Sequence, residues 1–329
     1  MTDTLFHAYT PLIVWTGLGL LIFRLLPNSF PKILGRGLYW VGVPLELIAL
    51  SRNNSQLDTS GSNPSFLAPL ITVSALFIGL LVALSVIWIW KLLAKQQKSE
   101  YNSRNSGSLQ QLSRVSEGSF LLAAVLGNTG FVGLAIAPSL VDANALNLAV
   151  IFSITHNVIG PFGLGVWIAS YYSHSPQQNR LLTQLRDILT VPPLWAFIIG
   201  YFTRKVQLPS IVESGLEKSV GVVIACAFLL IGIRLAQLQG WKSLELAFIP
   251  AVLRVVVIPL LVGIFTTLVL KIPPSSRLAM VLMSGMPSAF IGLVLAEEYN
   301  LDRDLIASSI LVSTVLLLFV LPLWIFIFG

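Results

Sequence analysis

Long apolar stretches, separated by shorter polar segments, follow one another along the whole chain. The stretches are continuously apolar and lack the two-residue alternation that the strands of a membrane barrel show. Lipid cannot hydrogen-bond to open backbone groups, so a helix, which satisfies its own backbone, is the expected conformation. The pattern therefore predicts an all-α integral membrane protein with ten transmembrane helices, at 8–27, 34–51, 66–94, 119–140, 146–171, 188–203, 218–238, 246–270, 278–298 and 305–328.

Two of these spans and two polar segments shape the expected topology. The second and sixth spans are shorter than the roughly 20 residues that a perpendicular helix needs to cross the hydrocarbon core. The segments 53–65 and 94–119 are polar and are expected to be loops, and neither resembles a ligand-binding domain. The remaining chain leaves no room for a soluble domain of ordinary size.

Composition agrees with this picture and removes several classes of partner. Hydrophobic residues make up 55% of the 329 and charged residues 10%, against about 25% charged in a soluble domain, and the mean hydropathy is +0.85. The net charge of +6 does not indicate nucleic acid, because basic residues beside spans orient membrane helices. The single cysteine, Cys226, excludes an internal disulfide and a cysteine metal cluster. The first residues, MTDTLFHAYTP, lack the basic region of a cleavable signal peptide, so the first span is expected to remain as an anchor.

Lysine and arginine are distributed unequally between the two sides of this topology. When loops are assigned alternately from an outside N-terminus, one side receives 13 of these residues and the other 6, with Arg254 left inside a span. The positive-inside rule places the richer side in the cytoplasm, so both termini are predicted to be non-cytoplasmic. The compact loops and the lack of targeting segments suit a multi-pass protein of a bacterial plasma (inner) membrane.

Two similar octets, GFVGLAIA at 130–137 and AFIGLVLA at 289–296, share four of eight positions. The first lies in the fourth span and the second in the ninth, which are equivalent places if the chain consists of two halves of five spans. An odd number of spans per half requires the second half to enter the membrane from the opposite side, as in inverted-repeat transporters. This predicts one repeat at 1–171, a cytoplasmic linker at 172–187 and a second repeat at 188–329.

Residues that weaken a helix cluster in and just before both octets. Glycine removes a side chain and proline removes a backbone donor, so each lowers the cost of leaving helical geometry. A helix broken inside the bilayer exposes N–H and C=O groups, which attract an anion at one end and a cation at the other. We therefore expect both spans to be interrupted, although small residues that only allow close helix packing are the alternative. The residues concerned are Gly127, Asn128, Thr129, Gly130, Gly133, Gly285, Pro287, Ser288 and Gly292.

The segment LGNTGFVGLAIAP at 126–138 resembles the fourth-span Asn-Thr-x-x-x-Gly-x-Pro motif of the auxin efflux carrier family, which includes plant PIN proteins and many bacterial permeases. The stretch MPSAFIGLVLAEEYNLDRDLIASSILVSTVLLLFVLPLW, with its Ala-x-Glu-Tyr segment, is similar to the C-terminal signature of that family. Further similar segments are YWVGVPLELIAL (39–50) with Pro44, VPPLWAFIIGYF (191–202) and FLLIGIRLA (228–236).

The resemblance implies a ten-helix inverted repeat whose broken fourth and ninth helices cross at mid-membrane and hold an organic anion. It also implies a scaffold of spans 1, 2, 6 and 7, a transport domain of spans 3–5 and 8–10, and a homodimer formed through the scaffold. The family often has a proline at each crossing position, where this chain has Ala135 and Gly292. The residues expected to bind substrate are Asn128, Thr129, Gly130, Gly133, Ala135, Pro287, Ser288 and Gly292.

Three ionisable residues lie inside apolar spans, where a charge costs roughly 2.5 kcal/mol or more. Glu46 can take up a proton, pair with a cation, or remain neutral and hydrogen-bonded. His156, with Asn157, can line the cavity at the crossing, or pack as an ordinary buried histidine. Arg254 can hold an anion, pair with Glu46, or serve the structure. The carboxylates of Glu297, Glu298, Asp302 and Asp304 are expected to be a solvated helix end and not a metal site.

These features predict a secondary carrier for a small organic anion or auxin-like weak acid, working by alternating access. The sequence has no phosphate-binding loop, zinc spacing or catalytic triad, so neither an ATP-driven pump nor an enzyme is expected, and no cofactor is expected. Coupling to sodium or protons, as in bile-acid symporters and sodium–proton antiporters, is one alternative. A non-transporting membrane sensor is another.

Overall fold

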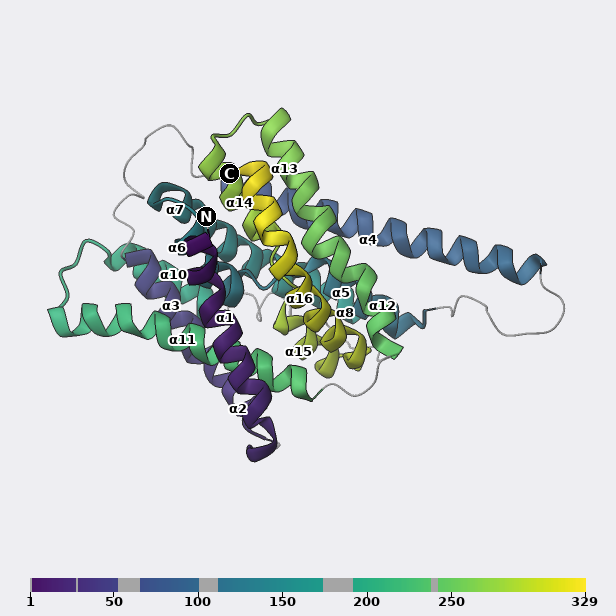
Figure 1. Ribbon diagram of the computed structural model, residues 1–329, viewed down its shortest axis with the longest axis horizontal. Helices are drawn as coiled ribbons and strands as arrows, with labels where there is room; N and C mark the ends of the chain where they lie inside the picture. The colour runs from purple at the N-terminus through teal and green to yellow at the C-terminus, as the bar shows by residue number, and fades with distance from the viewer. Residues whose placement is uncertain (1, 28, 53–65, 101–111, 174–191, 238–241) are drawn as a thin grey trace.

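Helices form all of the regular structure in the part of the chain that the computed structural model describes, residues 2–27, 29–52, 66–100, 112–173, 192–237 and 242–329 (Figure 1). The helices of the N-terminal half are α1 (Thr2–Ile22), η1 (Phe23–Leu25), α2 (Phe30–Gly37), η2 (Leu38–Gly42), α3 (Val43–Arg52), α4 (Leu67–Glu100), α5 (Arg114–Val125), η4 (Thr129–Gly133), α6 (Leu134–Leu140), α7 (Ala143–Asn157), η5 (Val158–Gly165) and α8 (Val166–Tyr172). Those of the C-terminal half are α10 (Pro192–Thr203), α11 (Ser210–Ala236), α12 (Lys242–Val252), η6 (Leu253–Val257), α13 (Ile258–Leu268), α14 (Pro274–Ser284), α15 (Phe290–Glu298) and α16 (Arg303–Phe328).

Five of the described helical stretches are long and apolar enough to cross a membrane. They are Leu67–Gln96, Ala143–Tyr172, Ser210–Ala236, Leu244–Leu268 and Arg303–Phe328. The expectation of an all-helical protein with membrane-spanning helices is confirmed at this level. The predicted linker at 172–187 lies almost entirely outside the described residues, as does the loop at 53–65.

Side-chain caps start several helices at the polar positions that flank the spans. The amide of Ser116 donates to Ser113 Oγ at 3.2 Å at the start of α5. Asp142 caps α7 in the same way, accepting from the amide of Ala145 at 2.8 Å, and Asp302 caps α16. Such caps satisfy amides that have no partner within the helix.

Some helices extend beyond the predicted spans. α11 begins at Ser210 rather than at 218, and α4 continues to Glu100 rather than ending at 94. α5 likewise begins at Arg114, so part of the predicted 94–119 loop is helical. Hydropathy detects only the apolar part of a helix, whereas the helix itself extends into polar sequence rich in good helix formers such as lysine, glutamine and glutamate.

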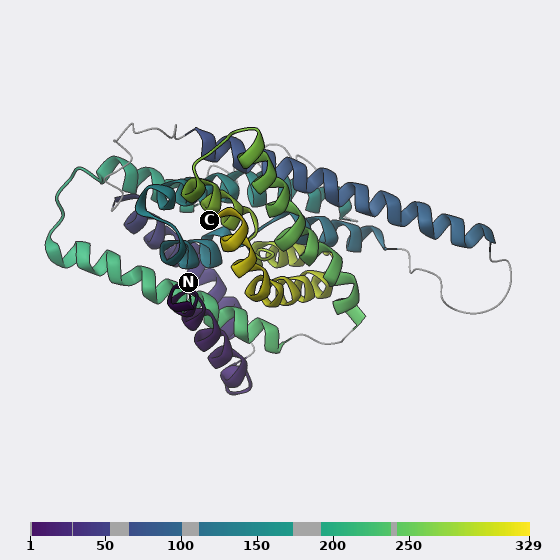
Figure 2. The ribbon, with the colours of Figure 1, turned by 45° about the horizontal axis from the view of Figure 1, so that its top comes forward.

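Close helix contacts are made through glycine in the group formed by α1, α3, α10 and α11 (Figures 1 and 2). A Cβ on Gly19 of α1 would overlap the backbone of α11 at Leu229, and one on Gly232 of α11 would overlap that of α1 at Thr16. In lipid, where apolar side chains gain little by leaving the solvent, such close backbone approach drives helix association.

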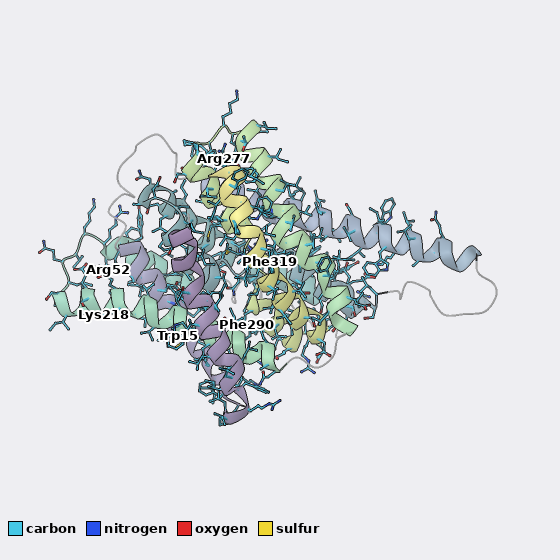
Figure 3. All side chains as sticks on the ribbon, viewed as in Figure 1. Trp15, Arg52, Lys218, Arg277, Phe290 and Phe319 are labelled. Atoms are coloured by element: carbon cyan, nitrogen blue, oxygen red, sulfur yellow. The ribbon has the colours of Figure 1, made fainter. Side chains whose placement is uncertain are left out.

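Many large apolar side chains are exposed on the surface of the molecule, while several polar and charged side chains are buried inside it. Phe319 and Phe326 on α16 are 70% and 80% exposed, and Trp15 on α1 is also exposed (Figure 3). By contrast, Glu46 is 0% and Arg254 1% exposed. An exposed apolar surface of this extent would make a soluble protein aggregate, whereas lipid covers it at no cost. This distribution therefore fits a protein whose solvent is the bilayer.

Candidate functional site

The fourth and ninth predicted spans are each interrupted near their middle. α5 ends at Val125 and η4 begins at Thr129. α14 ends at Ser284 and α15 begins at Phe290. Both interruptions that the sequence predicts are therefore present in the structure.

The two breaks lie side by side and pair as a short antiparallel bridge. The amide of Asn128 donates to the carbonyl oxygen of Pro287 at 2.7 Å, and the amide of Ala289 donates to that of Leu126 at 2.8 Å. Extended backbone in a lipid-embedded protein must find partners within the protein, and this bridge supplies them. Four half-helices consequently meet at one crossing.

Arg254, in the π-helical turn η6, lies between the C-terminal ends of α5 and α14. Its Nε donates to the carbonyl of Met286 and its Nη1 to that of Val125, both at 3.0 Å. The C-terminal end of a helix carries unpaired carbonyls and a partial negative charge, so the buried guanidinium stabilises both ends at once. A Cβ on Gly127 would overlap Arg254 Nη2, which explains the glycine at this break.

His156 and Ser288 connect the breaks to neighbouring elements. The amide of Gly127 donates to His156 Nε2 at 3.2 Å, so this ring nitrogen carries no proton. Ser288 Oγ donates to the carbonyl of Ala123 at 2.8 Å, and its amide donates to Ser313 Oγ at 3.0 Å. These side chains are buried and hold the backbone of the crossing in place.

The second half-helices, η4 and α15, point their N-terminal ends at the crossing but differ in their caps. Asn128 Oδ1 accepts from the amide of Phe131 at 3.3 Å and so caps η4. α15 follows Ala289, whose side chain offers no cap. The first amides of α15 therefore keep their partial positive charge without a side-chain partner, and such an end attracts an anion.

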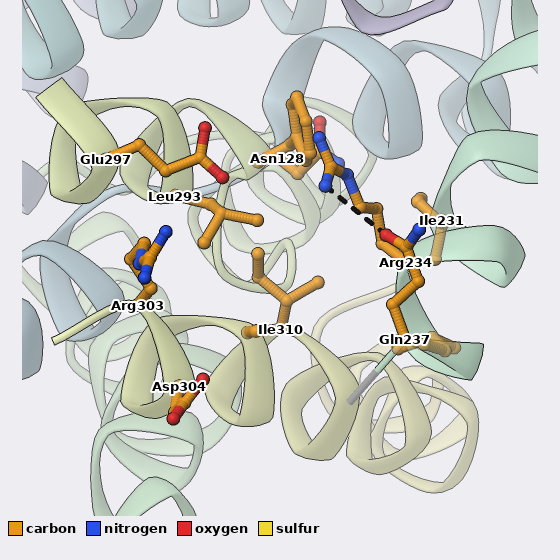
Figure 4. A pocket seen from close by; sticks show the side chains of 12 residues that line it. Asn128, Ile231, Arg234, Gln237, Leu293, Glu297, Arg303, Asp304 and Ile310 are labelled. Carbon is orange, nitrogen blue, oxygen red and sulfur yellow. Dashed lines mark hydrogen bonds between the residues drawn. The ribbon is translucent and has the colours of Figure 1, made fainter. Parts of the chain in front are cut away.

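Two cavities approach the crossing, and both Asn128 and Phe290 line each of them. The smaller has a volume of about 60 Å³ and is also lined by Val43, Gly130 and Asn157. The larger, of about 270 Å³, extends between α11, α15 and the start of α16 (Figure 4). The side chains of Asn128 and Phe290 therefore separate the two cavities.

Several residues that the sequence predicts to bind substrate contact other parts of the protein. Thr129 is fully buried, and its Oγ1 accepts from Ser153 Oγ at 3.3 Å. Asn157 Nδ2 donates to the same Ser153 Oγ at 3.3 Å while lining the smaller cavity. Gly133 lies against the side chain of Met283. Of the predicted substrate-binding residues, Asn128 and Gly130 line a cavity at the crossing, together with Asn157, which the sequence predicts to line the same space.

Ala135 and Gly292, the positions where the family often has proline, both lie inside helices beyond the breaks. Pro287 lies within the second break and supplies a carbonyl to the bridge. The interruption therefore occurs before both positions, because the contact of Gly127 with Arg254 and the missing amide of Pro287 fix where the helices stop.

The proposed pairing of Arg254 with Glu46 is not formed. Arg254 donates to backbone carbonyls, and both carboxylate oxygens of Glu46 are buried with no hydrogen-bond partner in the part of the chain that the structure describes. Glu46 lies on α3 one turn after Val43, which lines the smaller cavity. The guanidinium instead satisfies the carbonyls at the ends of α5 and α14.

The acidic residues near the start of α16 have separate roles. Asp302 Oδ1 accepts from the amide of Leu305 at 3.0 Å, and its Oδ2 accepts from Ser116 Oγ at 2.7 Å. Glu297 and Asp304 line the larger cavity. Within the described residues, no group of three or more His, Cys, Asp or Glu side chains gathers as a metal site would require.

Sequence comparison assigns the chain to a family of known general function. The profile of the family described as "Membrane transport protein" matches residues 62–325, which is most of the chain. The chain belongs to this family. The resemblance to auxin efflux carriers, drawn from the motifs above, is thereby confirmed.

Two archaeal proteins of this transport family are similar over long stretches. An uncharacterized transporter of Methanocaldococcus jannaschii is 27% identical over 311 residues, which cover 92% of this chain and 91% of that protein. An uncharacterized transporter of Methanothermobacter thermautotrophicus is 29% identical over 208 residues, covering 62% of this chain and 65% of that protein. Both names indicate transport rather than catalysis, and neither relative supports the bacterial origin expected from the sequence.

Sequence reasoning missed three residues that line the larger cavity of this transporter: Arg234, Phe290 and Arg303. In the sequence, Arg234 and Arg303 are two of the 13 basic residues that orient the spans, and Phe290 is an apolar position of the second octet. A usable signal was the position of Arg234 directly after the apolar run FLLIGI, where it ends a span and can turn back toward the protein interior.

Proposed function

We propose that this protein is a secondary carrier that moves a small organic anion across the membrane by alternating access, with the substrate bound where the two interrupted helices cross. The geometry of the crossing carries the proposal. Arg254 already neutralises the negative ends of α5 and α14, whereas the positive end of α15 has no side-chain cap. The crossing therefore presents net attraction for an anion.

We also propose that the chain spans the membrane ten times, as two inverted five-helix repeats. The two interrupted spans support this, since α5 has 12 residues before its break and α14 has 11. Their breaks pair in antiparallel orientation, as halves that enter from opposite sides would. The start of α1 and the end of α16 lie near each other in both views, in keeping with two termini on the non-cytoplasmic side of a plasma membrane (Figures 1 and 2).

Two packing groups support a division into a fixed and a moving part. α1, α3, α10 and α11 pack on one another, which corresponds to the scaffold of spans 1, 2, 6 and 7. α4 packs on α7, α5 on α8, α12 on α16 and α13 on α14, which corresponds to the transport domain. Motion of the second group would open the two cavities in turn. The exposed apolar side chains of α1 and η2, such as Trp15 and Trp40, would form a homodimer through the scaffold.

The energy for transport would come from the gradient of the substrate, the membrane potential or a coupled ion. One elementary charge moved through 100 mV gains about 2.3 kcal/mol, enough to concentrate a singly charged solute about 50-fold. No organic cofactor is proposed.

Counterflow in proteoliposomes tests the proposal. The purified chain is reconstituted with a panel of unlabelled carboxylates inside, and uptake of the labelled acid is measured with wild type, Asn128→Leu and the control Asn144→Leu. Asn128 lines both cavities, whereas Asn144 is exposed at the start of α7. We expect Asn128→Leu to lower the rate at least tenfold and the control to match wild type. Equal rates for all three proteins would reject the site at the crossing.

A sodium- or proton-coupled carrier is the second candidate, and Glu46 favours it. Its carboxylate is fully buried, has no hydrogen-bond partner and lies one turn from the smaller cavity. A group in this position can bind a coupling ion when that cavity opens. Uptake that is independent of both sodium and the pH gradient, and that is unchanged in Glu46→Gln, would exclude this mechanism. Binding without any flux would instead indicate a membrane sensor.

A further inference from the structure

The larger cavity is lined by two basic and two acidic side chains, Arg234, Arg303, Glu297 and Asp304. The two ion pairs found among the described residues, Lys91 with Glu117 and Arg52 with Glu213, involve none of these four. Four charges thus face a space of about 270 Å³ without neutralising one another in direct contact. Charged groups held in this way are available to a solute.

The four charges are not at the same depth. Glu297, Arg303 and Asp304 are exposed, whereas Arg234 is half-buried and its Nε is completely buried, with no hydrogen-bond partner among the described residues. Figure 4 shows Arg234 on the same side of the cavity as Asn128, and the other three charged side chains opposite. The mouth of the cavity therefore carries a net charge of −1, while its inner end is cationic.

Phe290 fixes the position of the guanidinium at this inner end. Arg234 Cζ lies 5.5 Å from the centroid of the Phe290 ring, a cation–π contact. Arg234 Nη1 donates to Gln237 Oε1 at 3.3 Å. Since Phe290 is the first residue of α15, the same ring places the guanidinium beside the uncapped helix end. Two sources of positive potential thus converge next to Asn128.

We propose that Arg234, with the Asn128 amide and the ring of Phe290, forms a subsite that binds the carboxylate of a singly charged organic acid before it reaches the crossing. A guanidinium donates in a planar fork that matches a carboxylate, and the end of the Arg234 side chain, beyond its buried Nε, lines the cavity. The ring and the apolar side chains of Ile231 and Leu293 then cover the body of the acid. The subsite rests on the proposed transport function and narrows its substrate class.

The acidic side chains at the mouth limit the charge of the substrate. Glu297 and Asp304 repel a second carboxylate that would point outward from the cavity, so a dianion is bound less well than a monoanion. A neutral analogue gains nothing from Arg234. The subsite therefore selects for one negative charge and an apolar body.

Equilibrium binding to the purified full-length chain in nanodiscs tests this subsite, with benzoate, the neutral benzamide and the dianion phthalate as probes. The variants are Arg234→Gln, the charge-preserving Arg234→Lys, and the control Arg36→Gln, which removes an exposed arginine of α2. We expect Arg234→Gln to weaken benzoate binding about tenfold or more, Arg234→Lys to weaken it less, and the control to match wild type. Benzamide should bind weakly and equally to all four proteins.

A second variant, Glu297→Gln, keeps the test decisive if Arg234→Gln does not fold. Glu297 is exposed, so this change leaves the packing intact, and we expect phthalate to bind about threefold more tightly while benzoate changes less. Two results would overturn the subsite: normal benzoate binding and counterflow in Arg234→Gln, or unchanged phthalate binding in Glu297→Gln. Neither result would contradict the transport function. Wild type that neither binds nor moves any carboxylate of the panel would overturn both.

Discussion

The two breaks occupy equivalent places in the fold but differ in the groups that satisfy their backbone. At the first break Gly127 makes room for Arg254, and Asn128 caps the helix that follows. At the second break Pro287 supplies a carbonyl to the bridge, and α15 begins at Ala289 without a side-chain cap. The first break is therefore the structural one, since Arg254, His156 and the Asn128 cap all hold its backbone. At the second break, the first amides of α15 keep a positive potential that a ligand can use. Two breaks with a similar backbone therefore need not bind a ligand equally well.

The largest expected effect comes from removing the side chain that the two breaks share. Arg254→Met leaves the carbonyls of Val125 and Met286 buried without donors, and we expect the free energy of unfolding to fall by about 3 kcal/mol or more. Thermal or denaturant unfolding in a mild detergent measures this change. Arg277→Met is the control, because Arg277 (Figure 3) is only partly buried and donates to a single carbonyl, that of Phe328. A control that is as destabilised as Arg254→Met would show that Arg254 has no special role at the crossing.

A pair of glycine substitutions separates the two breaks directly. A Cβ on Gly127 would overlap Arg254 Nη2, whereas the nearest atom to a Cβ on Gly292 is Ile306 Cγ2 at 3.7 Å. Gly127→Ala should therefore cost about 1–3 kcal/mol of stability, and Gly292→Ala should be neutral or stabilise α15 by up to about 1 kcal/mol.

The same unfolding assay, with Gly127→Ala repeated in an Arg254→Met background, identifies the cause. The cost of Gly127→Ala should shrink there, because the overlapping atom is gone. An undiminished cost would mean that glycine is needed for its backbone conformation and not for the contact.

The sequence predicted that these breaks exist, but not which side chains bind their free backbone groups. Glycine and proline near 127 and 287 mark where a helix can stop, because their effect on the backbone is local. The partners of Arg254 are Val125 and Met286, which lie far from it along the chain, so only the packed helices bring them together. Arg234 was missed for the same reason, since its position at the end of a span also fits a charge that only orients the helix.

Exchanging the caps should shift ligand binding between the breaks. Ala289→Ser offers α15 a hydroxyl cap, so we expect a gain in stability of about 0.5–1 kcal/mol together with weaker binding of a carboxylate probe, because the hydroxyl competes for the same amides. Asn128→Ala removes the cap of η4 and should cost about 1 kcal/mol. Unfolding and benzoate binding are measured on the same preparations. Tighter benzoate binding in Ala289→Ser would contradict the assignment of the anion to the end of α15.

The smallest expected effect concerns Asp142, which lies between α6 and α7 and is hydrogen-bonded to Ser275 in the first turn of α14. A hydrogen bond from the side chain of Ser275, followed by one from the amide of Ala145, holds the pKa of Asp142 below its ordinary value. A lowered pKa means that the stabilisation is present above the pKa of the unfolded chain, about 3.9, and is lost as the pH falls through the folded value. Asp142→Asn keeps the cap of α7 but removes the charge, so it should lower the melting temperature at pH 7 by only about 1 °C, because Asp142 is exposed. The difference from wild type should close toward pH 3, and a difference that persists there would assign the contribution of Asp142 to its neutral cap rather than to its charge.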